Sequence, residues 1–587
     1  MTISMRSLST SILLVALAAC SSARTPAAGP AGPAAVPPAT GARITDPSAQ
    51  RAESREGVVA AATPDAAAAG ARVLAEGGNA VDAAVAIGFA LAVTEPSMSG
   101  LGGRASFLVR LPDGTVAGLD GLNQVPAGYK PNSGVADVYE RAAIPGVPAT
   151  LATALARHGT WPLARVLAPA IALAEQGFIL GEAEAERWAG AREELAKFGG
   201  GRGTYLKSDG TLWKAGERVA NPLLAATLRR LAADGVDAFY RGALAAEIDR
   251  DMAANGGFIR AADLAAYQAL PSIVARGTYR GHQVVSNFRP AAGHAVVQAL
   301  QMLEQVEVPG AAEPARWAAV VGQAMQLAIA DRGVRRGTEE ESAAWLTSLE
   351  HASERARLIA VPARTVDVPV FADPFQPAGF FNPPGTLITA PTDREATTHY
   401  SAVDRDGRVV AMTQSLGPSM GTRLVASNLG FLYATRLGAV PGSRPGSTIA
   451  PTIVTAPDGQ SIVALGGAGD SRIISAVIQV ISRLIDHQMP LAEAMAAPRV
   501  HPDAQKTLRV EDGPIGVWSA ADRARLEAWG FTLIGAPSGF FGRVHAVRRP
   551  GASAPMLGVA EPRWTGGAAG PVAAPPHREP GAPSSRR

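Results

Sequence analysis

The residues with the clearest potential for chemistry stand at the start of a short hairpin in the middle of the chain. Residues 397–404 (TTHYSAVD) and 408–415 (RVVAMTQS) alternate between apolar and polar types, and the Asp-Gly pair between them is typical of a tight turn. The preceding residues, 371–396, are crowded with proline and glycine and have no periodicity, so we expect an exposed loop there. A long loop therefore leads directly into a strand whose first residue is Thr397.

A threonine in this position is what a self-cleaving hydrolase needs. If the peptide bond between Ala396 and Thr397 is cut, Thr397 becomes a new N-terminus. Its hydroxyl can then act as the nucleophile, and its own α-amine, whose reference pKa is about 8, can act as the base. No histidine or aspartate partner is required. The hairpin by itself is equally consistent with an ordinary strand, because threonine favours strands.

The rest of the chain favours the first interpretation, because it resembles the γ-glutamyltranspeptidase family. The Thr-Thr-His-Tyr-Ser run at 397–401 is followed, as in that family, by Ala-Pro-Thr-Ile at 450–453 and Gly-Gly-Ala-Gly-Asp-Ser-Arg-Ile at 466–473. Other matching segments, in chain order, are 77–84, 101–103, 145–148, 159–162, 177–178, 263–267, 279–281, 330–332 and 560–563. The resemblance covers residues 57 to 565. It implies an α+β fold of the N-terminal-nucleophile hydrolase type, a four-layer αββα sandwich that is self-cleaved into a large and a small subunit.

The resemblance also assigns the reacting groups. Thr397 matches the family's nucleophile, and residues 398–399 match neighbours whose expected role is structural. Ser415 stands where the family has a second threonine that hydrogen-bonds the nucleophile's amine, and a serine hydroxyl can still donate and accept. The family's oxyanion hole, formed by the amides of two consecutive glycines, falls on Gly469 and Asp470. An aspartate amide can fill that role, although its carboxylate would be unfavourable if it pointed inward.

Recognition of a γ-glutamyl group departs from the family pattern. Leu122 replaces the arginine that holds the α-carboxylate, and Gly417 replaces an asparagine that follows the second threonine. Arg436 and Ala439 replace the Gln and Asp that read the α-amine. A carboxylate that faces leucine loses a charge-assisted pair worth about 1.5–3 kcal/mol. We therefore do not expect ordinary recognition of glutathione-type substrates.

Four residues remain as candidates for binding the substrate. Ser447 and Thr448 match a pair of serines that contact the carboxylate in the family, and Arg104 and Arg436 are candidates for a new anionic subsite. Alternatively, each arginine is a surface or structural residue. An anionic subsite suits an acidic acyl group without a free amine, such as a glutaryl-like amide or an internal unit of a γ-linked polymer. The expected substrate is thus a small acyl amide or γ-glutamyl peptide, which is hydrolysed or transferred through a Thr397 ester without a cofactor or metal.

Composition and motifs weigh against several other classes of protein. The 54 basic and 51 acidic residues give a formal net charge of +3 and form no basic stripe, which argues against nucleic-acid binding. The nine histidines are scattered and match no metal motif. Residues 417–421 (GPSMG) fit the nucleophile elbow of α/β-hydrolases, but 422–430 lack the pattern of the helix that must follow. A binding protein that kept the fold and lost activity is the remaining alternative.

The first twenty residues predict an address in the bacterial cell envelope. Arg6 precedes an apolar run at 12–19, and Leu-Ala-Ala-Cys at 17–20 resembles a lipobox, where the signal is removed before a lipidated cysteine. Cys20 is the only cysteine in the chain, so no disulfide is expected; a free core cysteine is the other interpretation. The serine that follows it suits sorting to the outer membrane. We expect an outer-membrane lipoprotein that faces the periplasm and is anchored to the membrane by its lipid.

These interpretations divide the chain into five parts. They are a signal peptide at 1–19, the lipidated cysteine with a disordered Ala/Pro/Gly tether at 20–56, a large subunit at 57–396, a small subunit at 397–565 and a disordered tail at 566–587. The two subunits are expected to stay packed together as a heterodimer. The clearest local signals predict helices at 63–77, 80–93, 471–487 and 491–497 and a hairpin at 105–119. Residues 80–93 are apolar but shorter than the ~20 residues of a membrane span, so they predict a buried core helix.

Overall fold

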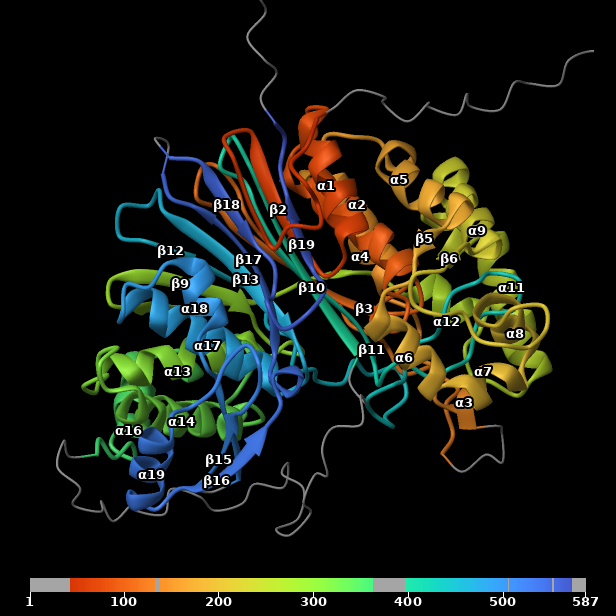
Figure 1. Ribbon diagram of the computed structural model, residues 1–587. Helices are drawn as coiled ribbons and strands as arrows, with labels where there is room; N and C mark the ends of the chain where they lie inside the picture. The colour runs from red at the N-terminus through yellow and green to blue at the C-terminus, as the bar shows by residue number, and fades with distance from the viewer. Residues whose placement is uncertain (1–42, 132–136, 363–395, 505, 552–553, 573–587) are drawn as a thin grey trace, which may run out of the picture. The chain divides into compact units, whose positions relative to one another are not determined.

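Within the described residues, two seven-stranded antiparallel sheets lie face to face (Figure 1). The computed structural model describes residues 43–131, 137–362, 396–504, 506–551 and 554–572. From edge to edge, the first sheet contains β1 (Arg51–Ser54), β18 (Met556–Val559), β17 (Arg543–Arg549), β13 (Ile462–Ala468), β12 (Thr452–Thr455), β9 (His282–Asn287) and β8 (Val274–Tyr279). The second contains β19 (Gly567–Ala569), β2 (Gly57–Ala61), β10 (Ala396–Asp404), β11 (Val409–Gly417), β3 (Arg104–Arg110), β4 (Val116–Gly121) and β7 (Leu270–Pro271). Small and branched apolar side chains such as Val403, Ala464 and Val547 fill the space between the sheets.

Helices cover the outer face of each sheet and complete four layers (Figure 1). The helices that pack against the second sheet are α1 (Pro64–Ala75), α2 (Ala80–Thr94) and α4 (Val147–His158), with α5 (Leu163–Gln176) and α9 (Pro222–Asp234) outside them. The helices that pack against the first sheet are α13 (Gly293–Glu304) and α17 (Arg472–Ile485), with α14 (Pro314–Asp331) outside them. The predicted αββα arrangement is therefore confirmed.

Shorter elements fill the periphery of both halves. On the side of the second sheet they are α3 (Asp137–Glu140), β5 (Phe178–Ile179), α6 (Glu182–Gly190), α7 (Arg192–Lys197), α8 (Gly199–Tyr205), β6 (Arg218–Val219), α10 (Asp237–Tyr240), α11 (Ala243–Ala254) and α12 (Ala261–Ala266). On the side of the first sheet they are α15 (Glu339–Leu346), α16 (Leu349–Ala356), α18 (Leu491–Ala496), β14 (Val500–Ala504), β15 (Thr507–Glu511), α19 (Ala520–Ala528), β16 (Thr532–Ala536) and the 3₁₀ turn η1 (Ser538–Phe540).

Helix α2 is the buried core helix that the sequence predicts. Asn79 caps its first turn by accepting hydrogen bonds from two backbone amides, and the Asp82 carboxylate accepts the Asn79 amide proton at 2.8 Å. All fifteen of its residues are buried, and it packs against β10 and β11. Gly88 permits this approach, because a Cβ there would lie 2.4 Å from the Tyr400 hydroxyl oxygen. Among the described helices, none combines the length and the apolar character that crossing a membrane requires.

The predicted hairpin is formed by β10 and β11 at the centre of the second sheet. Thr397 pairs with Ser415 and the ladder continues to Val403 and Val409, with an irregularity between Ala396 and Thr397. On the far side of β11, Ser415 pairs with Arg104 of β3. Directly opposed residues of an antiparallel sheet share a face, so Thr397, Ser415 and Arg104 line up across three neighbouring strands. The sheet thus fixes the relative positions of three side chains that are far apart in sequence.

Two boundaries predicted from the sequence are wrong at their inner ends. Part of the expected tether, Arg51–Ser54, is the edge strand β1 and pairs with β18. Part of the expected tail, Gly567–Ala569, is the edge strand β19 and pairs with β2. With four and three residues, the two segments are too short for a clear alternation of apolar residues, so their strand structure depends on partners distant in the chain. The signal peptide with Cys20, and most of the loop at 371–396, lie outside the described residues.

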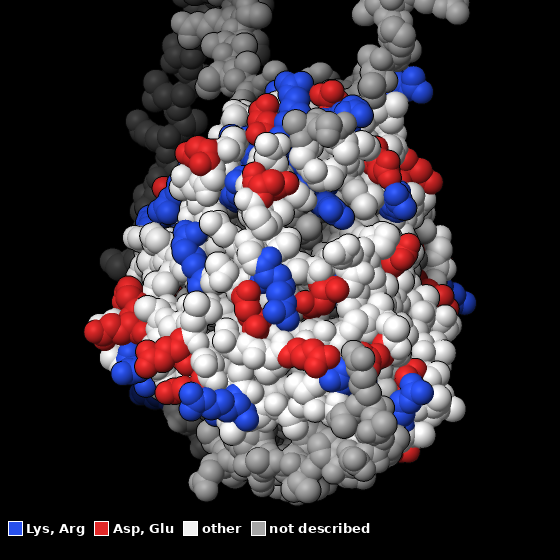
Figure 2. All heavy atoms as spheres, turned by 90° about the vertical axis from the view of Figure 1, so that its left-hand side faces the viewer, with Lys and Arg blue, Asp and Glu red and all other residues white. Residues whose placement is uncertain are grey.

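The charged side chains on the face shown in Figure 2 are mixed rather than segregated. Blue and red groups are interspersed over the visible surface, and no continuous basic stripe crosses it. This distribution agrees with the near balance of basic and acidic residues in the sequence.

Candidate active site

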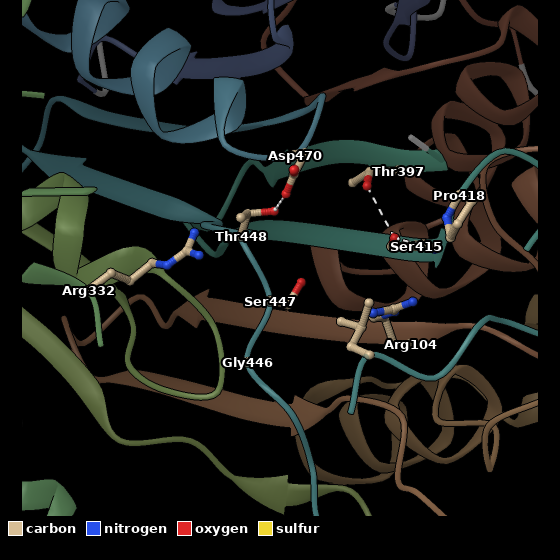
Figure 3. A pocket seen from close by; sticks show the side chains of 11 residues that line it. Arg104, Arg332, Thr397, Ser415, Pro418, Gly446, Ser447, Thr448 and Asp470 are labelled. Atoms are coloured by element: carbon tan, nitrogen blue, oxygen red, sulfur yellow. Dashed lines mark hydrogen bonds between the residues drawn. The ribbon is translucent and has the colours of Figure 1, made fainter. Parts of the chain in front are cut away.

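Thr397 and Ser415 form the centre of the site. The Thr397 hydroxyl donates a hydrogen bond to Ser415 Oγ at 3.2 Å, as the dashed line in Figure 3 marks. Ser415 Oγ also accepts a hydrogen bond from the Gly417 backbone N–H at 3.0 Å and donates one to the Ala396 carbonyl oxygen at 2.6 Å. The serine therefore connects the hydroxyl of Thr397 to the carbonyl group of the peptide bond that precedes it. The structure brings together the two residues that sequence reasoning paired.

A cavity of about 270 Å³ opens beside this pair (Figure 3). Its walls carry four hydroxyl groups, three charged groups and a small apolar surface. The lining residues are Arg104, Arg332, Thr397, Ser415, Gly417, Pro418, Leu437, Gly446, Ser447, Thr448 and Asp470. Of the four residues expected to bind substrate, Arg104, Ser447 and Thr448 lie in this wall.

Gly469 and Asp470 form the loop between β13 and α17. Gly469 has φ +126° and Asp470 has φ +51°, so both adopt backbone conformations that are uncommon for residues other than glycine. A Cβ at Gly469 would come within 3.2 Å of the Gly542 Cα. Among the described residues, neither amide of this loop donates a backbone hydrogen bond. Two unengaged amides in a strained loop beside a nucleophile suit an oxyanion hole.

The Asp470 carboxylate has a partner on the wall of the cavity. It accepts a hydrogen bond from the Thr448 hydroxyl at 2.8 Å (Figure 3). It also interacts with two cations, since its charge raises the pKa of both Arg104 and Arg332 against the effect of burial. The negative charge beside the Gly469 and Asp470 amides is thus opposed by two guanidinium groups.

His399, for which the resemblance implies a structural role, is buried between the two sheets. Its ring is fully buried between Thr413 Oγ1, 2.8 Å from Nδ1, and Ser401 Oγ, 3.0 Å from Nε2. Burial lowers the pKa of His399 well below its usual value, so the ring is neutral at pH 7. It packs flat against β13, where a Cβ at Gly466 would lie 2.4 Å from Cε1. His399 therefore holds the two sheets together behind the nucleophile.

Arg104 is buried and incompletely paired. Only 1% of its surface is exposed, its Nη2 donates to the Thr435 carbonyl oxygen at 2.9 Å, and its Nε has no hydrogen-bond partner among the described residues. Burial lowers the pKa of Arg104 to about 9, and the Asp470 charge opposes that shift. The side chain is still a cation at pH 7.

Arg332 is the cavity residue that the site assignment from sequence missed. It follows the last residue of α14, and its guanidinium points toward Thr448 in Figure 3. Its Nη1 is buried without a hydrogen-bond partner in the described structure, and burial lowers its pKa. Residues 330–332 are one of the segments that resemble the family, but the resemblance assigns no function to Arg332.

Arg436 does not lie in the wall of the cavity, contrary to the expectation that it could join an anionic subsite. Its guanidinium stacks over the Tyr129 ring, 3.7 Å from the centroid, lies 4.0 Å from the Glu140 carboxylate and donates to the Gly438 carbonyl. The next residue, Leu437, faces the cavity instead. Leu122 also lies outside the cavity wall, in the core beneath the first sheet.

No group of three or more histidine, cysteine, aspartate or glutamate side chains is arranged to hold a metal ion within the described part of the chain. The residues around Thr397 instead supply hydroxyl groups, backbone amides and arginines. This set can attack a carbonyl group, hold an oxyanion and bind a negatively charged substrate.

Two facing sheets between helical layers, with a threonine at the start of a central strand, define the class of N-terminal-nucleophile hydrolases. Residues 66–571 match the family described as gamma-glutamyltranspeptidase, and the chain belongs to that family. Over 504 residues it is 33% identical to the glutathione hydrolase proenzyme of Escherichia coli K12, covering 78% of this chain and 83% of that protein. Over 488 residues it is 33% identical to the acylase ACY 1 proenzyme of Pseudomonas sp. strain V22, covering 76% and 83%.

Solved structures support the same architecture. The crystal structure of cephalosporin acylase from Bacillus halodurans superposes with a TM-score of 0.76 over 93% of this chain and all of that chain. Its sequence identity is 24%, so this likeness concerns the fold.

Proposed function

We propose that this protein is a self-processing enzyme that hydrolyses or transfers the acyl group of a γ-glutamyl or related amide through an ester on Thr397. The observation that carries the proposal is the hydrogen-bonded chain from the Thr397 hydroxyl through Ser415 Oγ to the Ala396 carbonyl. The named relatives, a glutathione hydrolase and an acylase, support the substrate class.

The first step is cleavage of the chain itself. The Thr397 hydroxyl attacks the Ala396 carbonyl carbon, the C–N bond breaks, an ester forms and the hydroxyl proton passes to the Thr397 nitrogen. The Ser415 hydroxyl, which donates to the Ala396 oxygen at 2.6 Å, stabilises the negative charge on that oxygen during attack. Water then hydrolyses the ester and leaves a carboxylate on Ala396 and a free amine on Thr397. The two subunits remain associated as a heterodimer.

The second reaction uses the same hydroxyl on a bound amide. The new Thr397 amine accepts the hydroxyl proton, the oxygen attacks the substrate carbonyl, and the Gly469 and Asp470 amides hold the oxyanion. Departure of the amine leaving group, which takes up the proton, gives the acyl ester. Water or an acceptor amine then releases the acyl group and restores Thr397.

The test is the intact mass of the purified chain without residues 1–20, beside a Thr397→Ala variant. We expect two fragments that meet between Ala396 and Thr397 in the parent and one uncut chain in the variant. A matched control, Thr398→Ala, should still be cut, because that hydroxyl belongs to the neighbouring residue of β10 and does not line the cavity. An uncut parent would refute self-processing, and cleavage of the Thr397→Ala variant would refute the assigned nucleophile.

We also propose that the protein is an outer-membrane lipoprotein facing the periplasm. The Leu-Ala-Ala-Cys sequence at 17–20 supports this location. Metabolic labelling with a fatty acid should mark the parent chain and not a Cys20→Ala variant. Equal labelling of both chains, or of neither, would refute the lipid anchor.

A further inference from the structure

We infer that Arg104, in the space left by Gly417, binds a carboxylate at the end of the substrate's acyl chain, and that this acyl chain carries no ammonium group beside that carboxylate. This inference rests on the proposed acyl-transfer function and specifies its substrate class.

The position follows from strand register. Thr397, Ser415 and Arg104 are opposed residues on β10, β11 and β3, so the guanidinium of Arg104 belongs to the same face as the nucleophile. Both Arg104 and Thr397 line the cavity. An acyl chain whose carbonyl carbon meets Thr397 Oγ1 therefore extends within a cavity that contains this cation.

The room that Arg104 occupies depends on Gly417. A Cβ at residue 417 would lie 2.6 Å from Arg104 Nη2, which is closer than a real Cβ contact. Gly417 also has φ +93°, which disfavours any other residue. The arginine at 104 and the glycine at 417 thus depend on each other: the guanidinium fills the space that a side chain at 417 would take.

The guanidinium has donors left for a ligand. Its Nη2 donates to the Thr435 carbonyl, whereas its Nη1 makes no hydrogen bond among the described residues, and the side chain lines the cavity. An unpaired donor of a buried cation is costly unless a ligand satisfies it. A carboxylate fits, since it can accept two parallel bonds from a guanidinium.

The surrounding charges exclude an adjacent ammonium group. The cavity wall contains two guanidiniums, Arg104 and Arg332, and one carboxylate, Asp470. That carboxylate already accepts a hydrogen bond from the Thr448 hydroxyl and interacts with both cations. A ligand ammonium would therefore meet net positive charge, whereas a carboxylate would meet attraction. Pro418 and Leu437 offer an apolar wall for the methylene chain.

The experiment measures binding on the purified protein, whether or not it has cleaved itself, and turnover separately on the cleaved enzyme. Calorimetry compares glutarate, pentanoate and L-glutamate, and kinetics compare succinyl, glutaryl and adipoyl anilides with their uncharged acyl counterparts of equal length. We expect glutarate to bind about 10- to 100-fold more tightly than pentanoate, as one charge-assisted pair provides. L-Glutamate should bind more weakly than glutarate.

Variants test the residue that is responsible. Arg104→Met should abolish the preference for glutarate over pentanoate. Arg110→Met is the control and should preserve it, because Arg110 ends the same strand at a partly exposed position outside the cavity. Gly417→Ala should reduce glutarate binding although Arg104 is still present, because the added Cβ displaces the guanidinium. This variant tests the subsite if Arg104→Met fails to fold or to cleave itself.

Each result decides the inference. Equal binding of glutarate and pentanoate, or an unchanged preference in Arg104→Met or Gly417→Ala, overturns it. Tighter binding of L-glutamate than of glutarate overturns the absence of an ammonium site. Glutarate binding lost with Arg104→Met, in a chain that neither cleaves itself nor turns over any anilide, would support this subsite while refuting the proposed catalytic function.

Discussion

Replacing Ser415 with alanine should slow self-cleavage strongly. Ser415 Oγ makes three hydrogen bonds, to the Thr397 hydroxyl, the Gly417 amide and the Ala396 carbonyl oxygen. The bond to Ala396 acts on the oxygen that becomes negative when Thr397 attacks. Loss of one such donor raises a barrier by about 2.7–4 kcal/mol, a factor of about 10² to 10³ in rate. The bonds lost in the folded chain also cost about 1–3 kcal/mol of stability.

The assay follows the two fragments by mass spectrometry after the uncut chain is purified and its temperature raised. Ser415→Thr is the matched variant, because it restores a hydroxyl at the same position and should recover most of the rate. Thermal unfolding of each uncut chain separates slow chemistry from misfolding. Cleavage of Ser415→Ala at the parent rate, in a chain that melts normally, would refute the role of Ser415 in polarising the Ala396 carbonyl.

Three further predictions concern the packing around the site. Burial, together with the charge of Glu184, raises the pKa of Glu95 to about 7, so the folded chain has its full stability below pH 4.5 and loses part of it as the pH rises through 7. In the uncleaved Thr397→Ala background, the free energy of unfolding in urea of Glu95→Gln, relative to that of the chain with Glu95, should therefore rise by about 3 kcal/mol between pH 4 and pH 8. A difference that does not change with pH would contradict this prediction. Arg563→Met should lower the free energy of unfolding by about 3–5 kcal/mol, because it removes the cation that the buried Glu511 and Glu561 carboxylates share. A loss below about 1 kcal/mol in the same urea assay would refute this role of Arg563. Gly466→Ala should lower the free energy of unfolding by about 1–3 kcal/mol, because the added Cβ is forced against the His399 ring. Gly128→Ala is the control and should change the melting temperature little, because the space around Gly128 is open. Equal effects of the two substitutions would refute the close packing at Gly466.

Local sequence signals predicted the parts of the fold that local chemistry determines. The cap formed by Asn79 set the start of α2, and the alternation from Thr397 to Ser415 set the central hairpin, as the structure confirms. Strands β1 and β19 were missed, because each is defined by a partner distant in the chain.

The same distinction applies to the site. Thr397 and Ser415 could be paired from a hairpin register, since that register is local. The pairing of Arg104 with Ser415 depends on which strand lies beside β11, and the burial of Arg104 depends on the absence of a side chain at Gly417. Arg332 reaches the cavity from the end of α14, which lies outside the helices that cover the other sheet. No spacing in the sequence encodes these long-range contacts, nor does it show that Leu437 rather than Arg436 lines the cavity.

The order of strands in the two sheets determines whether the cleaved protein could refold after unfolding. A cut before Thr397 would assign β2, β3, β4 and β7 to one fragment and β19, β10 and β11 to the other, yet all seven strands belong to one sheet, with β2 between β19 and β10. The other sheet is likewise mixed, with β1, β9 and β8 from the first fragment. Neither fragment then holds a complete sheet, so refolding becomes an encounter between two incomplete chains. The lifetime of the cleaved protein would then be governed by its rate of unfolding, because an unfolded molecule must reassemble from two separate chains.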